Sequence, residues 1–366
     1  MKLSEFRVQG LVATDFTIDD DYYDADGDGA ANPAFTIGGL SHKWFDGNGV
    51  EITDENKMVG CSGFRQPLTL KINLAAQSHS RYGNPRDSDP AGLEQSYQIK
   101  TTSGICYARP NQMNVYPQKA WIGKNKRGGW TWNGSNSTVD PAYGGGYSSD
   151  FVVISNSVSS SGIVNVTDGG FKPNASRNFP TTGFPKASFN LVVTGSPSDW
   201  TFSSNGGSAV TVNSNGKVTL NSKPSGAVTI TATENATGQG HSYTFNLALW
   251  VVPKGNMLYA NAKTTCGGAY KIPSRAQLTN SAGRRMTSSN YQFTNGYTRK
   301  VDGSVFGEWG FIDSTTYPGS QWDSSAQYYW TRDARSPDEQ FIVGSGYGNV
   351  ISGAVGNAYS YAVCLG

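Results

Sequence analysis

The sequence predicts a mainly β, multidomain protein in which Ig-like β-sandwiches are followed by an α+β domain. Three observations favour this fold class. The 366 residues leave room for roughly two to four domains of ordinary size. Glycine is frequent, with 45 residues, and only 15% of the residues are charged, a composition typical of short strands joined by turns. Several segments of the second half alternate apolar and polar residues, as half-buried strands do.

The clearest strand pattern lies in the middle of the chain. Alternating segments occur at 189–195, 200–204, 209–220, 227–233 and 242–247. Asn213-Ser-Asn-Gly216 separates two apolar runs, and Gly216 can take the positive φ that a tight hairpin requires. The pattern predicts a β-sandwich. It resembles the bacterial Ig-like modules of surface proteins, through GKVTL at 216–220 and VTITA at 228–232.

The last hundred or so residues form a second unit, bracketed by Cys266 and Cys364. Between the two cysteines lie a predicted short helix and two aromatic clusters, at 271–278, 306–310 and 328–333. This layout resembles a C-type lectin-like domain, in which one long-range disulfide ties the two ends together. The triplets that chelate calcium in sugar-binding members, Glu-Pro-Asn or Gln-Pro-Asp and Trp-Asn-Asp, do not occur here. The resemblance therefore implies recognition that does not need calcium.

The order of these two modules carries the family resemblance. A segment rich in Pro and Phe, residues 170–189, leads into the sandwich. An Ig-like module followed directly by a terminal lectin-like domain resembles the distal region of the intimin and invasin family of bacterial outer-membrane adhesins. The resemblance implies a monomeric, extracellular passenger on the bacterial cell surface, anchored in the outer membrane through a β-barrel that lies outside this chain.

We therefore expect three domains. They are a β-rich domain at 1–166, for which we expect an Ig-like or related sandwich, a bacterial Ig-like domain at 167–253 and a C-type lectin-like domain at 254–366. The segment 124–147 is rich in Gly and aromatic residues, and we interpret it as a long insertion in the first domain. The four cysteines, Cys61, Cys106, Cys266 and Cys364, are too widely spaced for CxxC motifs and fall into one pair at each end of the chain. Disulfides indicate an oxidising compartment.

An acidic loop near the start of the chain is the sharpest chemical motif. Its carboxylates and amide, Asp24, Asp26, Asp28 and Asn32, follow the spacing of the first half of a calcium loop. The twelfth position is Phe35, where a complete EF-hand loop has a bidentate Glu. Two interpretations stay open, a partial Ca²⁺ site and a solvated acidic turn. We expect no required cofactor.

The candidate receptor contacts lie in the irregular segment 315–337. Their aromatic and Arg content is typical of interface hot spots, and the candidates are Tyr317, Trp322, Arg332, Asp333 and Arg335. Trp322 could equally well be a core residue, whereas Trp309 and Trp330 are expected in the core. The predicted function is that of a cell-surface adhesin that binds a host protein or glycoprotein through its distal domain, with the Ig-like domains as a spacer rod. A phage or virion receptor-binding protein is one alternative. Binding by the N-terminal domain, with the lectin-like domain as a structural cap, is another.

Other functions find little support in the residues. The three histidines, His42, His79 and His241, show no zinc-ligand spacing, and no Gly-x-Ser-x-Gly elbow stands between a strand and a helix. We expect no enzyme activity. The formal charge of +2, without a basic and aromatic groove, disfavours nucleic-acid binding. No apolar stretch approaches the roughly 20 residues that span a bilayer, so we expect no membrane span within this chain.

Overall fold

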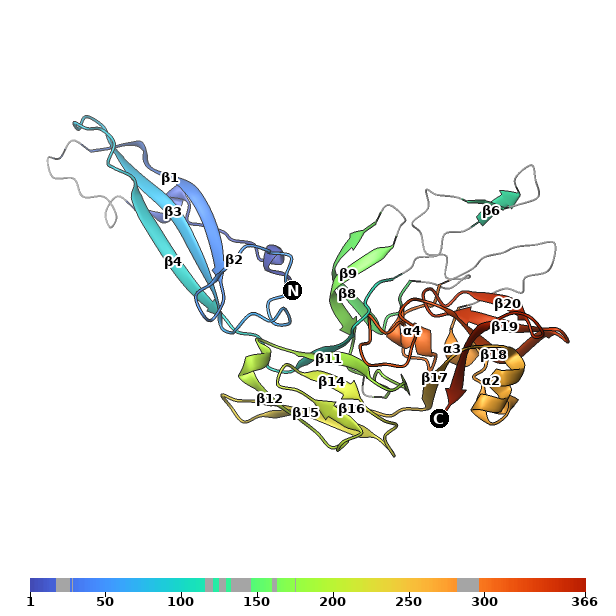
Figure 1. The fold of residues 1–366 in the computed structure, drawn as a ribbon. Helices are drawn as coiled ribbons and strands as arrows, with labels where there is room; N and C mark the ends of the chain where they lie inside the picture. The colour runs from blue at the N-terminus through green and yellow to red at the C-terminus, as the bar shows by residue number, and fades with distance from the viewer. Residues whose placement is uncertain are drawn as a thin grey trace. The chain divides into compact units, whose positions relative to one another are not determined.

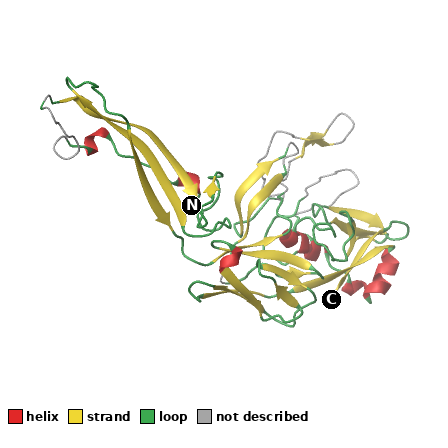
Figure 2. Cartoon of the chain, turned by 60° about the vertical axis from the view of Figure 1, so that its left-hand side comes forward, coloured by secondary structure: helices red, strands yellow, loops and turns green. Residues whose placement is uncertain are grey.

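The computed structural model describes residues 1–17, 27, 29–115, 121–124, 130–132, 146–159, 163–174, 176–281 and 296–366. The chain divides into two compact units (Figure 1). Unit 1 comprises Met1–Ser103 with Thr194–Ser196, and unit 2 comprises Gly104–Val193 with Pro197–Gly366. Strands carry both units and the described helices are short (Figure 2), so the predicted mainly β, multidomain fold class is confirmed. No helix of the described residues is long and apolar enough to cross a membrane.

Unit 1 is built on one antiparallel sheet with the strand order β2-β1-β3-β4. Its elements are η1 (Leu3–Glu5), η2 (Ala13–Asp15), β1 (Ala30–Phe45), β2 (Glu51–Ile52), β3 (Leu68–Ser80) and β4 (Ala91–Ile99). Trp44 on β1 lies opposite Leu70 on β3, and the ring of Phe6 packs edge-on against Trp44 at 5.1 Å. Trp44 is therefore the centre of a local core, whose buried members are Leu3, Trp44, Ile52, Val59, Leu68 and Leu70.

Unit 2 begins with two sheets that pack face to face. One has the order β13-β14-β11-β5-β9-β8, and the other β12-β15-β16. The strands are β5 (Ile105–Pro110), β8 (Phe151–Val158), β9 (Val164–Phe171), β11 (Ala187–Val193), β12 (Trp200–Ser204), β13 (Val210–Val212), β14 (Lys217–Leu220), β15 (Val228–Glu234) and β16 (Gly240–Phe245), with η3 (Pro197–Asp199) before β12. Phe189 and Leu191 of the first sheet share one hydrophobic cluster with Val228 and Ile230 of the second. The alternating pattern has thus produced the predicted sandwich.

The turn between β13 and β14 follows the sequence prediction. Gly216 has φ +75°, and its backbone N donates to the oxygen of Asn213 at 3.0 Å. A Cβ at Gly216 would lie 2.7 Å from the oxygen of Leu191, so glycine is required here both for its conformation and for the close approach of β11.

The large sheet joins strands from both sides of the predicted boundary at residue 166. That position lies inside β9, and β5, which precedes it, pairs with β11, with Leu191 opposite Ala108. The strand pairing therefore places β5, β8 and β9 in the same sheet as β11, and the three-domain division stays a prediction. In the segment 124–147, β7 (Trp130–Trp132) pairs through its backbone with β6 (Trp121–Lys124), which ends where the segment begins. Most of the rest of the segment lies outside the described residues.

The C-terminal part of unit 2 is a six-stranded mixed sheet with the order β10-β17-β21-β18-β19-β20. Its strands are β10 (Thr182–Gly183), β17 (Leu249–Met257), β18 (Tyr328–Ser336), β19 (Glu339–Gly344), β20 (Val350–Ala354) and β21 (Ser360–Leu365), and its helices are α2 (Tyr259–Cys266), η4 (Ala269–Lys271), α3 (Arg275–Leu278) and α4 (Val305–Trp309). A disulfide joins Cys266 and Cys364, with their Cα atoms 5.2 Å apart, which confirms this predicted pair. Cys61 and Cys106 are also disulfide-bonded.

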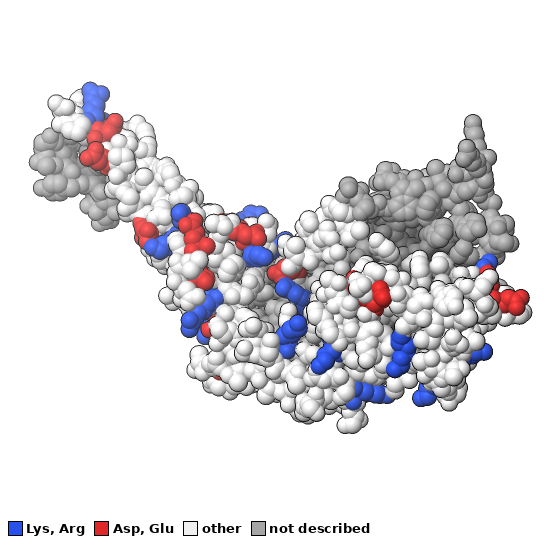
Figure 3. Space-filling view, viewed as in Figure 1, with Lys and Arg blue, Asp and Glu red and all other residues white. Residues whose placement is uncertain are grey.

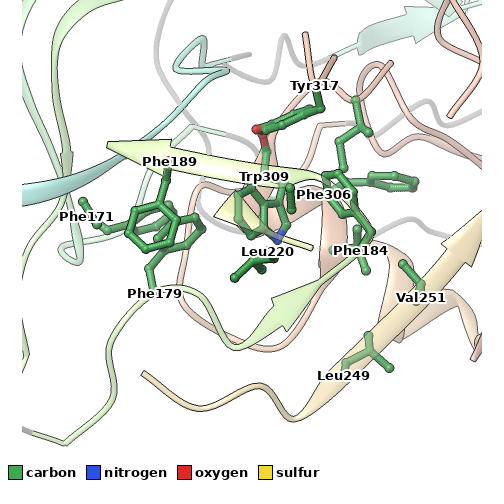
Figure 4. Close-up of a cluster of buried hydrophobic side chains, with 14 of the residues drawn as sticks. Phe171, Phe179, Phe184, Phe189, Leu220, Leu249, Val251, Phe306, Trp309 and Tyr317 are labelled. Atoms are coloured by element: carbon green, nitrogen blue, oxygen red, sulfur yellow. The ribbon is translucent and has the colours of Figure 1, made fainter. Parts of the chain in front are cut away.

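The largest hydrophobic cluster of unit 2 is rich in aromatic rings, and Figure 4 shows its centre. Trp309, on α4, is fully buried, and its ring lies 4.8 Å from Phe179 and 5.3 Å from Phe184. Its Nε1 donates to the backbone oxygen of Thr182 at 3.0 Å. Trp330 is also fully buried, so both tryptophans that were expected in the core are there. The Pro- and Phe-rich segment 170–189 thus supplies rings that α4 packs against.

Candidate functional site

Two of the predicted receptor contacts, Tyr317 and Trp322, lie in the core of unit 2 and not on its surface. Tyr317 is fully buried; its hydroxyl donates to the backbone oxygen of Trp309 at 2.6 Å, and its ring packs edge-on against Phe184. Trp322 is 3% exposed and packs edge-on against Phe184 and Tyr329. The structure thus contradicts a surface position for Tyr317, and for Trp322 it favours the core interpretation that the sequence left open. Burial of a large aromatic ring among other rings is favourable because it removes apolar area from water.

Asp333 and Arg335 lie on β18 but are engaged within the domain. The Oδ2 of Asp333 accepts a hydrogen bond of 2.7 Å from the backbone N of Arg275, at the start of α3. Arg335 donates to Oε2 of Glu339 and to Oγ of Ser352, both at 2.8 Å. Asp333 thus stabilises a helix terminus, and Arg335 ties β18 to β19 and β20. Both side chains therefore stabilise the domain, whether or not they also contact a receptor.

Arg332 is the predicted contact whose side chain the structure leaves exposed. Its Nη1 makes a long contact of 3.4 Å with the backbone oxygen of Tyr270, and its backbone N donates to Pro273 at 3.0 Å. The side chain of Tyr270 is 66% exposed, and Lys271 beside it is exposed as well. We call Tyr270, Lys271 and Arg332 the Arg332 patch. It presents an aromatic ring beside two positive charges, and Tyr and Arg are enriched among residues that dominate binding energy.

Tyr270 is held in place by two glycines and by the disulfide. Gly267 ends α2 with φ +81°, and Gly268 follows with φ +127°. A Cβ on Gly268 would lie 2.7 Å from the ring of Tyr270, so the ring can rest against this backbone only because the residue is glycine. Cys266, one residue before the turn, is bonded to Cys364 on β21. Sequence reasoning missed Tyr270, and the Gly-Gly pair after the cysteine was the signal that could have found it.

The distribution of charged side chains on unit 2 favours a positively charged contact surface. On the face shown in Figure 3, Lys and Arg side chains are spread over unit 2 and Asp and Glu are fewer. Asp333, the acid next to Arg332 in the chain, directs its Oδ2 to the backbone N of Arg275. Among the described residues, no carboxylate lies within ion-pair distance of Arg332 or Lys271. Their charges are therefore available to an acidic partner.

Most of the predicted calcium loop lies outside the described residues. Asp24, Asp26 and Asp28 lie outside the described residues, and Asn32 lies in β1. In the part of the chain that the structure describes, no three His, Cys, Asp or Glu side chains gather as a metal site would need. The partial calcium site stays a prediction.

The histidines occupy separate polar contacts. In unit 1, His42 Nε2 lies 3.1 Å from Glu55, and His79 lies between Asp87 at 2.7 Å and Thr36 at 2.8 Å. In unit 2, His241 packs edge-on against Trp200. These contacts cross-link strands or pack a ring, and they do not converge on one another.

Comparisons with known proteins identify the central module. Residues 163–245 match the family model described as invasin, domain 4. A search of curated proteins returned no match. Among solved structures, an intimin mutant from EHEC O157:H7 is 21% identical, covers 53% of this chain and 92% of its own, and has a TM-score of 0.35. Invasin, a bacterial integrin-binding protein, is 14% identical, with coverages of 92% and 59% and a TM-score of 0.44. A C-terminal 282-residue fragment of intimin in complex with the intimin-binding domain of its translocated receptor Tir is 16% identical, with coverages of 91% and 86% and a TM-score of 0.41.

The family model matches the sandwich itself. Its range runs from β9 to β16 and includes the Phe-rich segment that packs against Trp309. The superpositions on solved structures are loose, so the assignment depends on this domain. The family is not one of enzymes. Through residues 163–245, which match invasin domain 4, the chain is similar to the passenger region of the invasin and intimin family.

Proposed function

We propose that this protein is a cell-surface adhesin of the bacterial outer membrane and that the Arg332 patch binds a host protein or glycoprotein. The observation that carries the proposal is the exposure of Arg332 beside Tyr270 and Lys271, in a disulfide-closed region that follows an invasin domain 4. Invasin and intimin, to which the chain is similar, are an integrin-binding and a Tir-binding protein by their descriptions. Recognition of a receptor is therefore the function that the domain order and the patch support together.

The chemistry of the patch favours an acidic protein surface as the receptor. The guanidinium of Arg332 can hold a carboxylate with two parallel hydrogen bonds, and Lys271 adds a second charge. The ring of Tyr270 supplies apolar area beside them, with a hydroxyl for a hydrogen bond. No member of the patch is a calcium ligand, so binding should persist in the presence of a chelator.

The test is binding of the whole chain to cultured host cells, measured by flow cytometry with and without EGTA. Arg332→Ala and Tyr270→Ala should each weaken binding by at least about tenfold, as hot-spot residues do. Tyr82→Ala and Lys254→Ala are matched controls, because Tyr82 is 69% exposed and Lys254 is also exposed. All four variants should keep the wild-type melting temperature, since the changed side chains lie on the surface.

Treatment of the cells separates the possible receptors. Prior digestion of surface proteins with a protease should abolish binding if the receptor is a protein or glycoprotein. Binding that survives both Arg332→Ala and Tyr270→Ala, at wild-type strength, would overturn the assignment of the patch. It would favour the alternative in which the N-terminal domain binds and the C-terminal domain is a structural cap.

A further inference from the structure

Unit 2 contains a polar pocket apart from the residues of the Arg332 patch. Its volume is about 460 Å³, within the range of about 300–1,000 Å³ that is typical of small-molecule sites. It lies between the loop that precedes β10 and the end of β16, and it is lined by Asn174, Ser176, Arg177, Asn178, Thr244, Phe245, Asn246 and Ala248.

Side-chain hydrogen bonds hold the wall of this pocket in place. The backbone N of Asn174 donates to Oδ1 of Asn178 at 2.7 Å, and both the N and the Oγ of Ser176 donate to Oδ1 of Asn174, at 2.9 and 2.8 Å. Nδ2 of Asn178 donates to the backbone oxygen of Thr244 at 2.7 Å, which fastens the loop to β16. The wall is therefore formed before any ligand arrives, and preorganisation of this kind lowers the entropic cost of binding.

Three polar groups at the pocket are left for a ligand. The guanidinium of Arg177, the amide of Asn246 and the Nδ2 of Asn174 have no hydrogen-bond partner within the described ranges of the chain. Arg177 lies beside the turn before α4, 3.6 Å from the place where a Cβ on Gly303 would stand. Asp302 in that turn accepts hydrogen bonds from Ser304 at 3.0 Å and from Asn280 at 2.6 Å, and forms no ion pair with Arg177.

We propose that this pocket binds a carboxylate-bearing sugar, with Arg177 holding the carboxylate and the Asn side chains holding the hydroxyl groups. A guanidinium accepts a carboxylate in a planar, two-bond arrangement, and no acid lines the pocket to compete for it. Asparagine carries both a donor and an acceptor, which suits a ligand whose hydroxyl groups do the same.

The lining disfavours a peptide ligand. The lining includes two apolar residues, Phe245 and Ala248. Phe245 is only 2% exposed, so the exposed apolar side chain is the methyl group of Ala248. A peptide anchor needs an apolar pocket for an aromatic or aliphatic side chain, and this wall offers none. With one guanidinium and no lysine in the lining, the charge also matches a single carboxylate better than a phosphate.

The test is a titration of the whole chain with N-acetylneuraminate and with glucuronate, followed by saturation-transfer NMR and calorimetry. Both acidic sugars should bind, whereas galactose and the methyl ester of N-acetylneuraminic acid should bind at least about tenfold more weakly, because they lack the charge. Arg177→Ala should weaken binding of both acids by at least about tenfold, and Asn246→Ala by severalfold. Lys172→Ala, which removes an exposed charge that does not line the pocket, should change neither affinity.

Three outcomes would overturn the proposal: no saturable binding of either acid, equal binding of galactose, or unchanged binding by Arg177→Ala. Arg177 and Asn246 are exposed, so their variants should fold normally, and an unchanged melting temperature verifies this. The pocket shares no residue with the Arg332 patch, so either proposal can fail while the other holds.

Discussion

The cores of the two units differ in size and in kind. In unit 1 a local cluster surrounds Trp44, and the edge strand β4 is exposed along nearly its whole length, with Leu93 at 38% and Tyr97 at 49% exposure. In unit 2 a continuous aromatic cluster around Trp309 extends through the sandwich and the C-terminal sheet, and a disulfide closes its last region. A large core can hold a buried ionisable group that a small core could not stabilise. In unit 2 this group is the fully buried carboxyl of Glu308, beside Trp309.

The largest expected effect comes from removal of the disulfide, with Cys266→Ser and Cys364→Ser introduced together. The bond spans 98 residues, and the chain-entropy model assigns a loop of that length about 4–5 kcal/mol of stability. Guanidinium denaturation should show a lower midpoint for unit 2 and an unchanged transition for unit 1. Thr265→Ser, at an exposed neighbour of Cys266, is the control. A wild-type midpoint in the double variant would show that the aromatic core alone holds the region.

Matched tryptophan substitutions test whether the two cores are separate. Trp44 is 1% exposed and Trp309 is fully buried, so each change to Ala should cost about 3–5 kcal/mol. Trp44→Ala should lower the transition of unit 1 alone, and Trp309→Ala that of unit 2 alone. Calorimetry of the whole chain resolves the two transitions. If either variant moved both transitions together, the two units would unfold as one and their cores would not be independent.

The sequence predicted the features that depend on local residue patterns, and it predicted the disulfide between Cys266 and Cys364. Alternation of apolar and polar residues indicated the strands of the sandwich, and Gly216 marked its turn, because both follow from short-range backbone rules. It did not predict that β5 would pair with β11, with Phe189 opposite Pro110, since such pairing joins segments far apart in the chain. Nor did it predict that Tyr317 is buried while Tyr270 is exposed. In irregular segments no periodicity tells which ring faces the core.

The buried carboxyl of Glu308 should make the stability of unit 2 depend on pH. Its carboxylate accepts hydrogen bonds from the backbone N of Thr181 at 2.9 Å and of Thr182 at 2.8 Å, and from both threonine hydroxyls. Burial nevertheless raises the pKa of Glu308 from its usual 4.5 to about 7. The buried groups that face it are Arg299, whose Nη2 donates to the backbone oxygen of Glu308 at 2.9 Å, and Tyr243.

The sign of the effect follows from the raised pKa. The folded state binds this proton more tightly than the unfolded state, so the contribution to stability is complete below about pH 4.5 and is lost as the pH rises to about 7. The loss amounts to roughly 3 kcal/mol. Glu308→Gln should flatten this decline, because the Gln oxygen can accept both backbone N–H groups while its amide donates to a threonine hydroxyl. Glu339→Gln is the control, and an unchanged slope in Glu308→Gln would contradict the assignment.

The smallest expected effect comes from Asp333, which links the Arg332 patch to helix α3. Asp333→Ala removes the acceptor for the backbone N of Arg275, which lies in the first turn of α3, and should cost about 1 kcal/mol. Because Arg332 and Pro273 meet beside this cap, the variant should also weaken receptor binding, by less than Arg332→Ala does. Asp338→Ala, at an exposed carboxylate in the turn after β18, should change neither quantity. If Asp333→Ala lowered binding as much as Arg332→Ala at an unchanged melting temperature, Asp333 would itself be a contact, and its role would be recognition instead of support.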